Sequence, residues 1–155
     1  MEKLLKLKPF QQKPDFCGQA CLKIVFENFG VELSEKEIVK GVKCGKKGAE
    51  AEDLLKFSKK LGFRGFVKDF SSLSDIRKYI KKKIPVIVEW FYDDDGHFSV
   101  VSGIDRENIY LQDPDLGHTR AMSLKLFRRL WFTFPGEYIY HREDINLRRM
   151  LVIYK

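Results

Sequence analysis

The hydrophobic residues in the first sixty positions recur at the spacing of amphipathic helices. Apolar side chains fall three and four residues apart, and Gly30 and Gly62 follow two of these patterns as helix stops. Ser34, with Glu37 three residues later, is typical of a capping box at a helix start. Three helices are therefore predicted, over residues 17–29, 34–42 and 49–61.

After residue 62 the pattern becomes that of short strands. Strands are predicted over residues 63–67, 84–90, 97–104, 109–112 and 150–154. Turns rich in Asp and Gly separate consecutive strands, which favours antiparallel neighbours. Two further helices are predicted, one from Ser72 or Ser74 to residue 82 and one over residues 123–130, while residues 131–147 give no assignable pattern. The order indicates an α+β fold in which N-terminal helices pack on an antiparallel sheet.

Length and composition are those of one globular domain. The chain has 155 residues, of which 44% are hydrophobic and 33% charged, so we predict a single domain over residues 1–155. No apolar run is long enough to span a bilayer, and the N-terminus lacks the pattern of a signal peptide. Three cysteines are an odd number, which suits a reducing compartment better than a disulfide framework. We therefore expect a cytoplasmic location.

The net charge of +7 raises the possibility of a nucleic-acid partner. Basic residues are, however, spread along the chain with acids between them, and no nucleic-acid motif accompanies them, so a solvated basic face is the preferred interpretation. The cysteines and histidines lack the paired spacing of a zinc site. No metal or other cofactor is predicted, and the sequence gives no indication of the oligomeric state.

Cys17 occupies the first turn of a predicted helix. Free backbone N–H groups and the helix dipole stabilise a thiolate at this position, and the thiolate is the reactive form of cysteine. Gly18 allows the backbone to approach a substrate carbonyl, and the Cys17 N–H is a candidate oxyanion donor. The alternative is a buried structural cysteine. Cys21, one turn further, is predicted to be such a core residue, and Cys44 an exposed loop thiol.

His97 and Asp113 are the candidate partners of this cysteine. His97 opens a predicted strand directly after a turn, which would place its ring at the sheet edge, and Asp113 ends the next strand before Pro114. If the two strands form a hairpin, the side chains come within hydrogen-bonding reach and give a Cys, His, Asp arrangement. The ordinary alternatives are a surface histidine and a turn-forming aspartate.

Three segments together resemble a known family. They are Gln11–Ala20 (Gln-Gln-Lys-Pro-Asp-Phe-Cys-Gly-Gln-Ala), Gly96–Val101 (Gly-His-Phe-Ser-Val-Val) and Asp113–Pro114. In order and spacing they are similar to the C39 peptidases, papain-like cysteine proteases best known from transporters that cut a leader peptide after a double glycine. The resemblance implies a papain-like fold and a peptide or protein substrate.

By the same resemblance, Cys17 matches the nucleophile, His97 the base and Asp113 the residue that orients the histidine. The oxyanion glutamine matches either Gln11, six residues before the cysteine, or Gln12 in a variant register, with Gln12 slightly preferred. Phe16 departs from the Asp of transporter members, and the chain resembles the stand-alone C39-like proteins. The expected function is hydrolysis of a peptide or related amide through a thioester. A non-catalytic peptide-binding domain and an acyl transferase are the alternatives.

Overall fold

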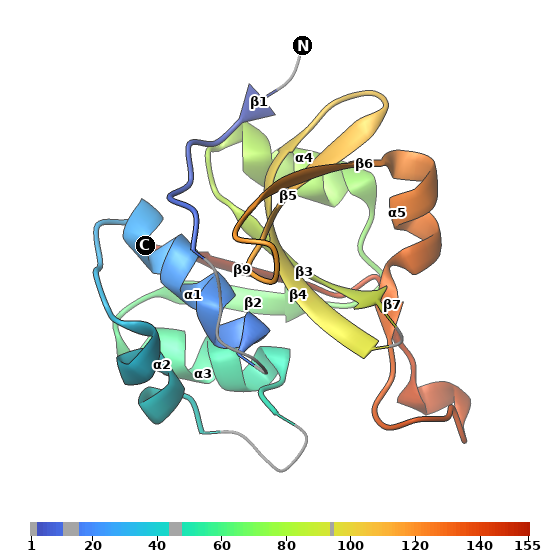
Figure 1. Ribbon diagram of the computed structural model, residues 1–155, viewed down its shortest axis with the longest axis horizontal. Helices are drawn as coiled ribbons and strands as arrows, with labels where there is room; N and C mark the ends of the chain where they lie inside the picture. Colours follow the sequence, from blue (N-terminus) through green and yellow to red (C-terminus); the bar gives the residue numbers. More distant parts are fainter. Residues whose placement is uncertain (1–2, 11–15, 44–47, 94) are drawn as a thin grey trace.

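The computed structural model describes residues 3–10, 16–43, 48–93 and 95–155. The centre of the molecule is a twisted sheet in which every strand pair is antiparallel (Figure 1). Its order is β2 (Arg64–Lys68), β9 (Met150–Tyr154), β3 (Val86–Tyr92), β4 (Asp95–Ile104), β5 (Asn108–Asp113) and β6 (His118–Ser123), and β1 (Lys3–Leu4) pairs with the end of β4.

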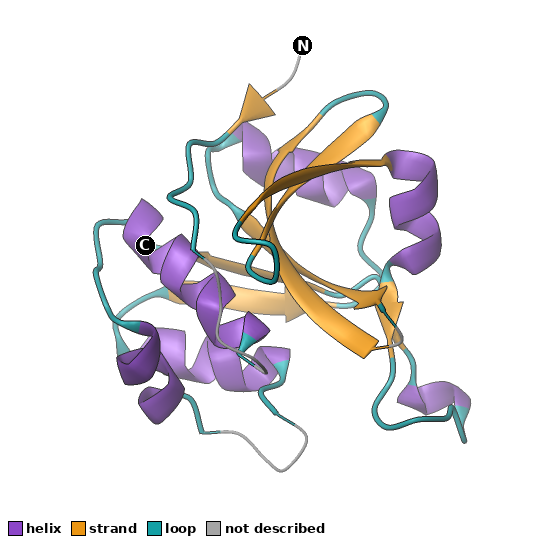
Figure 2. Cartoon of the chain, in the orientation of Figure 1, coloured by secondary structure: helices purple, strands orange, loops and turns teal. Residues whose placement is uncertain are grey.

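Helices cover both faces of the sheet (Figure 2). One face packs against α1 (Cys17–Asn28), α2 (Glu35–Gly41) and α3 (Ala51–Lys60), and the other against α4 (Leu73–Lys81) and α5 (Leu124–Leu130). Because side chains alternate along a strand, β9 supplies Leu151 to the first core and Val152 to the second. Both β9 side chains are almost fully buried.

Several helix boundaries follow directly from the local sequence. The hydroxyls of Ser34, Ser72 and Ser123 accept hydrogen bonds from backbone N–H groups three residues ahead, which caps α2, α4 and α5. Ser72, and not Ser74, is therefore the cap of α4. Gly30 and Gly62 have positive φ angles of 80° and 90° after α1 and α3, a conformation that glycine adopts without a steric penalty.

The predicted α+β class and papain-like architecture agree with this structure, although four details differ. β4 begins at Asp95, two residues before His97, because the β3–β4 hairpin is tighter than expected and Tyr92 pairs with Asp95. Asp93 has a positive φ of 51° in this turn. β4 also lies between β3 and β5, so His97 is on a central strand and not at the sheet edge.

The other two differences lie in the second half of the chain. Strand β6 was not predicted, because its exposed polar residues lack a hydrophobic face. The unassigned region 131–147 contains β7 (Phe132–Thr133), a short 3-10 helix (Arg142–Asp144) and β8 (Asn146–Leu147), with β7 and β8 forming a small separate sheet. These elements are too short for periodicity to reveal them. That residues 1–155 form one domain stays a prediction.

Across the parts of the chain that the structure describes, none of the helices combines the length and apolar character needed to traverse a bilayer.

Candidate active site

Cys17 is the first residue of α1, as the sequence predicted. The first hydrogen bond of the helix runs from Ala20 N–H to the Phe16 carbonyl over 2.9 Å, so the N–H groups of residues 17–19 have no partner within the helix. The first turn contains no acidic side chain. The positive end of the α1 dipole therefore faces Cys17 without compensation from a carboxylate of its own helix, which favours a negative charge there.

Gly18 allows the start of α1 to lie close against the sheet. A Cβ atom at this position would lie 3.1 Å from Leu54 Cδ1 and 3.3 Å from Phe98 Cδ2. Because glycine has no Cβ, the start of α1 can lie close to Phe98, the residue after His97 on β4. Packing thus favours glycine at position 18, in addition to the close approach of a substrate carbonyl that the sequence suggests.

His97 is held by aromatic neighbours on β3. It pairs with Trp90 in the β3–β4 register, and its ring lies 5.8 Å from the Trp90 ring and 5.3 Å from the Tyr92 ring, centroid to centroid. The Trp90 indole N–H donates to Ser99 Oγ over 3.0 Å, which fixes the indole. Only 7% of His97 is exposed, so the ring has little freedom to move.

Asp113 is the direct partner of His97. Its Oδ1 lies 2.6 Å from His97 Nε2 and also accepts the Asp115 backbone N–H over 3.1 Å. The side chain is fully buried. β4 and β5 are antiparallel neighbours, and their pairing at Val100–Gln112 places the end of β5 beside the start of β4. The hairpin condition for bringing His97 and Asp113 together is met.

The electrostatics of the three side chains are linked. Burial lowers the pKa of His97, but hydrogen bonding to Asp113 and to Cys17 outweighs burial, and the pKa rises to about 9. For Asp113, burial acts to raise the pKa, yet the hydrogen bond with His97 and its charge lower it overall. Since Nε2 faces Asp113, Nδ1 is the ring nitrogen left for Cys17. The titration of one histidine is thus linked both to a thiol and to a buried carboxylate.

Arg120 is a site residue that the sequence analysis missed. Its Nη1 donates to Asp113 Oδ2 over 3.0 Å, and its guanidinium lies over the rings of Tyr92 and Trp90, 4.9 and 5.7 Å from their centroids. Arg120 belongs to β6, the strand that was not predicted, and pairs with Leu111 of β5. Without that strand, no sequence signal connected the arginine to Asp113.

The remaining predicted residues fall into two groups. Cys21 is completely buried, and burial, followed by the nearby charges of Cys17 and Asp113, raises the pKa of its thiol well above the usual value. This agrees with its prediction as a core residue. Gln11, Gln12 and Cys44 lie outside the described residues. Within the described ranges, no group of three or more Cys, His, Asp or Glu side chains is arranged to hold a metal ion.

Comparison with protein families identifies the family of the chain. The model of the peptidase C39 family matches residues 8–134 of the chain. The chain belongs to the peptidase C39 family. This C39 chain is 29% identical over 132 residues to the probable functional amyloid protease FapD of Pseudomonas aeruginosa, a match covering 78% of the chain and 55% of FapD.

Two solved structures have the fold of this C39 chain. The peptidase domain of Streptococcus ComA, a bifunctional ABC transporter involved in quorum sensing, superimposes with a TM-score of 0.74 at 23% identity, covering 97% of the chain and 98% of that peptidase-domain structure. A double glycine motif protease from an AMS/PCAT transporter, solved with its leader peptide, gives a TM-score of 0.72 at 19% identity, covering 97% of the chain and 93% of that protein. At 23% and 19% identity, the two similarities show only the fold that the chain shares with these proteins.

Proposed function

We propose that this chain is a cysteine peptidase in which Cys17 is the nucleophile, His97 the general base and acid, and Asp113 the residue that orients the histidine. The observation that supports this most is the contact of buried His97 with Asp113, 2.6 Å from Nε2 to Oδ1, together with the position of Cys17 at the start of α1. Acyl transfer through a thiol requires a nucleophile, a base that takes its proton and a group that orients the base. Membership of the C39 family supports the same reaction.

The proposed reaction runs through a thioester. His97 takes the Cys17 proton, and the thiolate attacks the scissile carbonyl carbon to form a tetrahedral oxyanion. The imidazolium returns its proton to the leaving amine as the C–N bond breaks. Water, deprotonated by His97, then attacks the thioester, and the carboxylic acid leaves as the Cys17 thiol is restored.

The oxyanion needs donors that are in place before the reaction. The N–H groups at the start of α1, which have no partner within the helix, are suited to this because they lie beside the thiol and carry the positive end of the helix dipole. We propose a side-chain donor from Gln12 or Gln11 as the second contribution, on the resemblance alone.

The proposed substrate is a peptide or an unfolded protein segment. Support comes from the family and from the structural neighbour that was solved with a leader peptide. The leader and its double glycine belong to that neighbour, and the proposal for this chain extends only to a peptide bond. A cytoplasmic location likewise stays a prediction.

The deciding experiment is incubation with a library of peptides derived from digested proteins, followed by mass spectrometry of new termini. We expect cleavage by the wild type and by Cys21→Ala, and none by Cys17→Ala. An added amine, such as glycinamide, distinguishes hydrolysis from acyl transfer, since transfer would give amide products. Cleavage that persists in Cys17→Ala, or a complete lack of cleavage by a protein whose Cys17 is readily alkylated, would overturn the proposal.

A further inference from the structure

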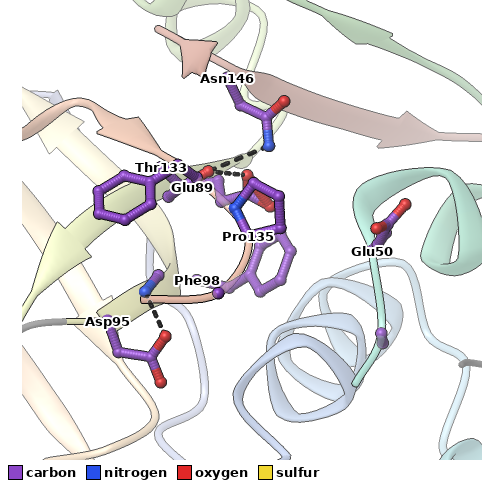
Figure 3. A pocket seen from close by; sticks show the side chains of 11 residues that line it. Glu50, Glu89, Asp95, Phe98, Thr133, Pro135 and Asn146 are labelled. Carbon is purple, nitrogen blue, oxygen red and sulfur yellow. Dashed lines mark hydrogen bonds between the residues drawn. The ribbon is translucent and has the colours of Figure 1, made fainter. Parts of the chain in front are cut away.

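A pocket of about 220 Å³ lies at the end of β4 that carries His97 (Figure 3). Its walls come from three parts of the chain: the residues before α3, the facing ends of β3 and β4, and the segment around β7 and β8. One water molecule has about 30 Å³ of liquid volume, so the pocket has room for a long side chain. Neither the proposed mechanism nor the family comparison assigns it a role.

The described residues that line the pocket include three carboxylates and no lysine or arginine. The carboxylates are Glu50, Glu89 and Asp95. The excess of acids runs against the composition of the chain, which has 29 basic and 22 acidic residues. Apolar walls from Phe98, Phe134 and Pro135 complete the lining. Acidic groups above an apolar wall suit a Lys or Arg side chain, whose stem is apolar and whose head is cationic.

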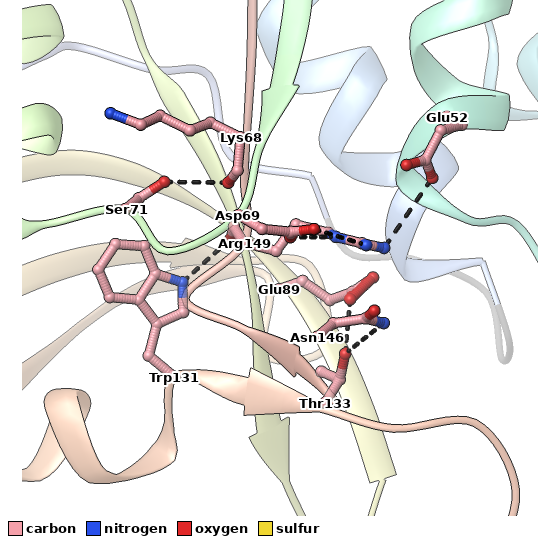
Figure 4. A network of polar contacts seen from close by, with 9 residues as sticks. All are labelled: Glu52, Lys68, Asp69, Ser71, Glu89, Trp131, Thr133, Asn146 and Arg149. Carbon is pink, nitrogen blue, oxygen red and sulfur yellow. Dashed lines mark hydrogen bonds and ion pairs between the residues drawn. The ribbon is translucent and has the colours of Figure 1, made fainter. Parts of the chain in front are cut away.

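Of the three carboxylates, Glu89 is the most buried and the most constrained by hydrogen bonds. It belongs to β3 and is only 9% exposed. Thr133 Oγ1 donates to Glu89 Oε2 over 2.6 Å, and Asn146 Nδ2 donates to Thr133 Oγ1 over 3.2 Å, so a relay of hydrogen bonds from β7 and β8 fixes the carboxylate (Figures 3 and 4). All three side chains line the pocket.

The charge of Glu89 is not matched by an ion pair within the described ranges. The neighbouring cation, Arg149, is bound through Nε and Nη2 to Asp69, over 2.7 and 3.1 Å, and its Nη1 lies 3.9 Å from Glu52 (Figure 4). Burial raises the pKa of Glu89, although the Thr133 hydrogen bond and the Arg149 charge act in the opposite direction. An additional cation in the pocket would therefore be stabilised by a partly desolvated carboxylate.

The pocket is close to the site of the proposed reaction. Gly96 and Phe98, which line it, precede and follow His97 on β4, although their alternating positions put them on the opposite face of the sheet from the His97 side chain. The Phe98 ring also lies beside Gly18, the residue after Cys17. Phe98 thus contributes both to the pocket and to the surroundings of the α1 start, which makes a substrate side chain close to the scissile bond the candidate occupant of the pocket.

We propose that this pocket, with Glu89 at its base and Asp95 and Glu50 at its rim, binds a lysine or arginine side chain of the peptide substrate close to the scissile bond. The inference rests on the proposed function and adds to it the substrate class, a peptide with a cationic residue at a fixed position. Asp95 is fixed for this role by a hydrogen bond from Gly96 N–H to Oδ1 over 2.8 Å.

The first test is a synthetic peptide library in which Arg, Lys, norleucine and Glu are varied at each of three positions on either side of the cleaved bond. We expect Arg and Lys to be preferred over norleucine about tenfold at one position, which corresponds to about 1.4 kcal/mol. In Glu89→Gln, which keeps the shape and the Thr133 contact, this ratio should fall to about twofold. Asp95→Asn, a change at an exposed position, should lower the ratio less.

Glu107→Gln is the matched control. Glu107 is exposed in the turn after β4, at the opposite end of that strand from His97, and its loss removes the same charge without altering the pocket. The tenfold ratio should persist in this variant. Cleavage without preference for a cation at any position, or an equal preference in the wild type and in both pocket variants, would overturn the inference while leaving the peptidase assignment in place.

The second test does not depend on catalysis. Cys17→Ala protein is titrated with N-acetyl-arginine methylamide or with its norleucine counterpart, and the backbone amide signals of Gly96 and Thr133 are followed by NMR. We expect tighter binding of the arginine compound, by about tenfold, and similar binding of the two in the double variant with Glu89→Gln. Equal binding of both compounds to Cys17→Ala would exclude the cation site. Selective binding by a protein that cleaves nothing would instead reject the peptidase function alone.

Discussion

Arg120 and His97 share the Asp113 carboxylate, one on each oxygen. Arg120 Nη1 donates to Oδ2 over 3.0 Å, and His97 Nε2 lies 2.6 Å from Oδ1. Asp113 is fully buried, whereas the Arg120 side chain is 26% exposed. The arginine therefore compensates a buried charge and fixes the plane of the carboxylate, and through it the orientation of the histidine ring. Arg120 is a positioning residue in the proposed reaction.

The first prediction follows from this relationship. Arg120→Met removes the charge and the hydrogen bond but keeps an apolar side chain against Trp90 and Tyr92. We expect kcat/KM on a cleaved peptide to fall about tenfold, because a hydrogen bond to a charged group contributes about 1.5 to 3 kcal/mol. Arg120→Lys should recover part of the rate, since it restores the charge without the planar guanidinium.

Arg128→Met is the control for Arg120, because Arg128 is exposed on α5 and carries the same charge. It should leave kcat/KM unchanged. If Arg120 had only a structural role, its variants would lower the thermal midpoint while the pH profile of kcat/KM stayed the same, and the positioning role would be wrong.

The second prediction compares the two partners in the His97–Asp113 pair. His97→Ala removes the proton carrier and should lower kcat by about a thousandfold or more, within the range of general acid–base catalysis. Asp113→Asn should cost less, because an amide oxygen can still accept from the ring, but it loses the charge that favours imidazolium. Single-turnover rates at saturating peptide measure both. Equal and negligible effects would favour a domain that binds peptides without cutting them.

The third prediction concerns the titration of His97. The wild-type ring should change its NMR shifts at a pH of about 9, and at a lower pH in both Cys17→Ala and Asp113→Asn, because each partner contributes to raising the pKa. As the imidazolium is lost through this range, kcat/KM should decline at high pH. A wild-type midpoint near 6.5, or one that neither substitution moves, would contradict the assembled site.

The same shift predicts how stability depends on pH. An unfolded histidine has a pKa of about 6.5, below the folded value of about 9, so between these values the folded protein holds a proton that the unfolded chain releases. The stabilisation from His97 is thus complete below about pH 6.5 and is lost as the pH rises toward 9. Urea unfolding at several pH values should show this decline, and His97→Ala should reduce it.

The fourth prediction separates the two described cysteines. Cys21 is wholly buried four residues after Cys17, so Cys21→Ala leaves a small cavity and should lower the free energy of unfolding by about 1 kcal/mol while peptide cleavage continues. Cys17→Ala should abolish peptide cleavage and leave the free energy of unfolding nearly unchanged. Peptide mapping after brief iodoacetamide treatment should find Cys17 alkylated and Cys21 protected. Rapid labelling of Cys21 in the folded protein would show that the start of α1 opens in solution.

Local signals in the sequence were sufficient for the elements that carry Cys17 and Asp113. Helical spacing and Gly30 located α1, and the strand-ending Asp113 before a proline was recognisable because turns have a strong residue signature. The contact between His97 and Asp113 required the additional condition of a hairpin, which consecutive strands with short turns usually satisfy.

Other features depend on contacts that a single sequence does not encode locally. Arg120 was missed because β6 exposes most of its residues, so no alternation of hydrophobic and polar positions marked it as a strand. The pocket at the end of β4 is lined by Glu50, Glu89 and Asn146, which are far apart along the chain. Only the packing of the β7–β8 segment onto the ends of β3 and β4 brings them together.

The position of β9 has a consequence for the order in which the protein can be built. This strand follows β2 to β8 in the chain, yet it lies between β2 and β3 and hydrogen-bonds to both. Until Met150–Tyr154 has left the ribosome, β2 has no neighbour in the sheet, and the β3–β6 meander ends in an open edge. β2 and the β3–β6 meander are therefore joined only after all the strands between them in the sequence have been synthesised, so the sheet does not form progressively from β2 onward.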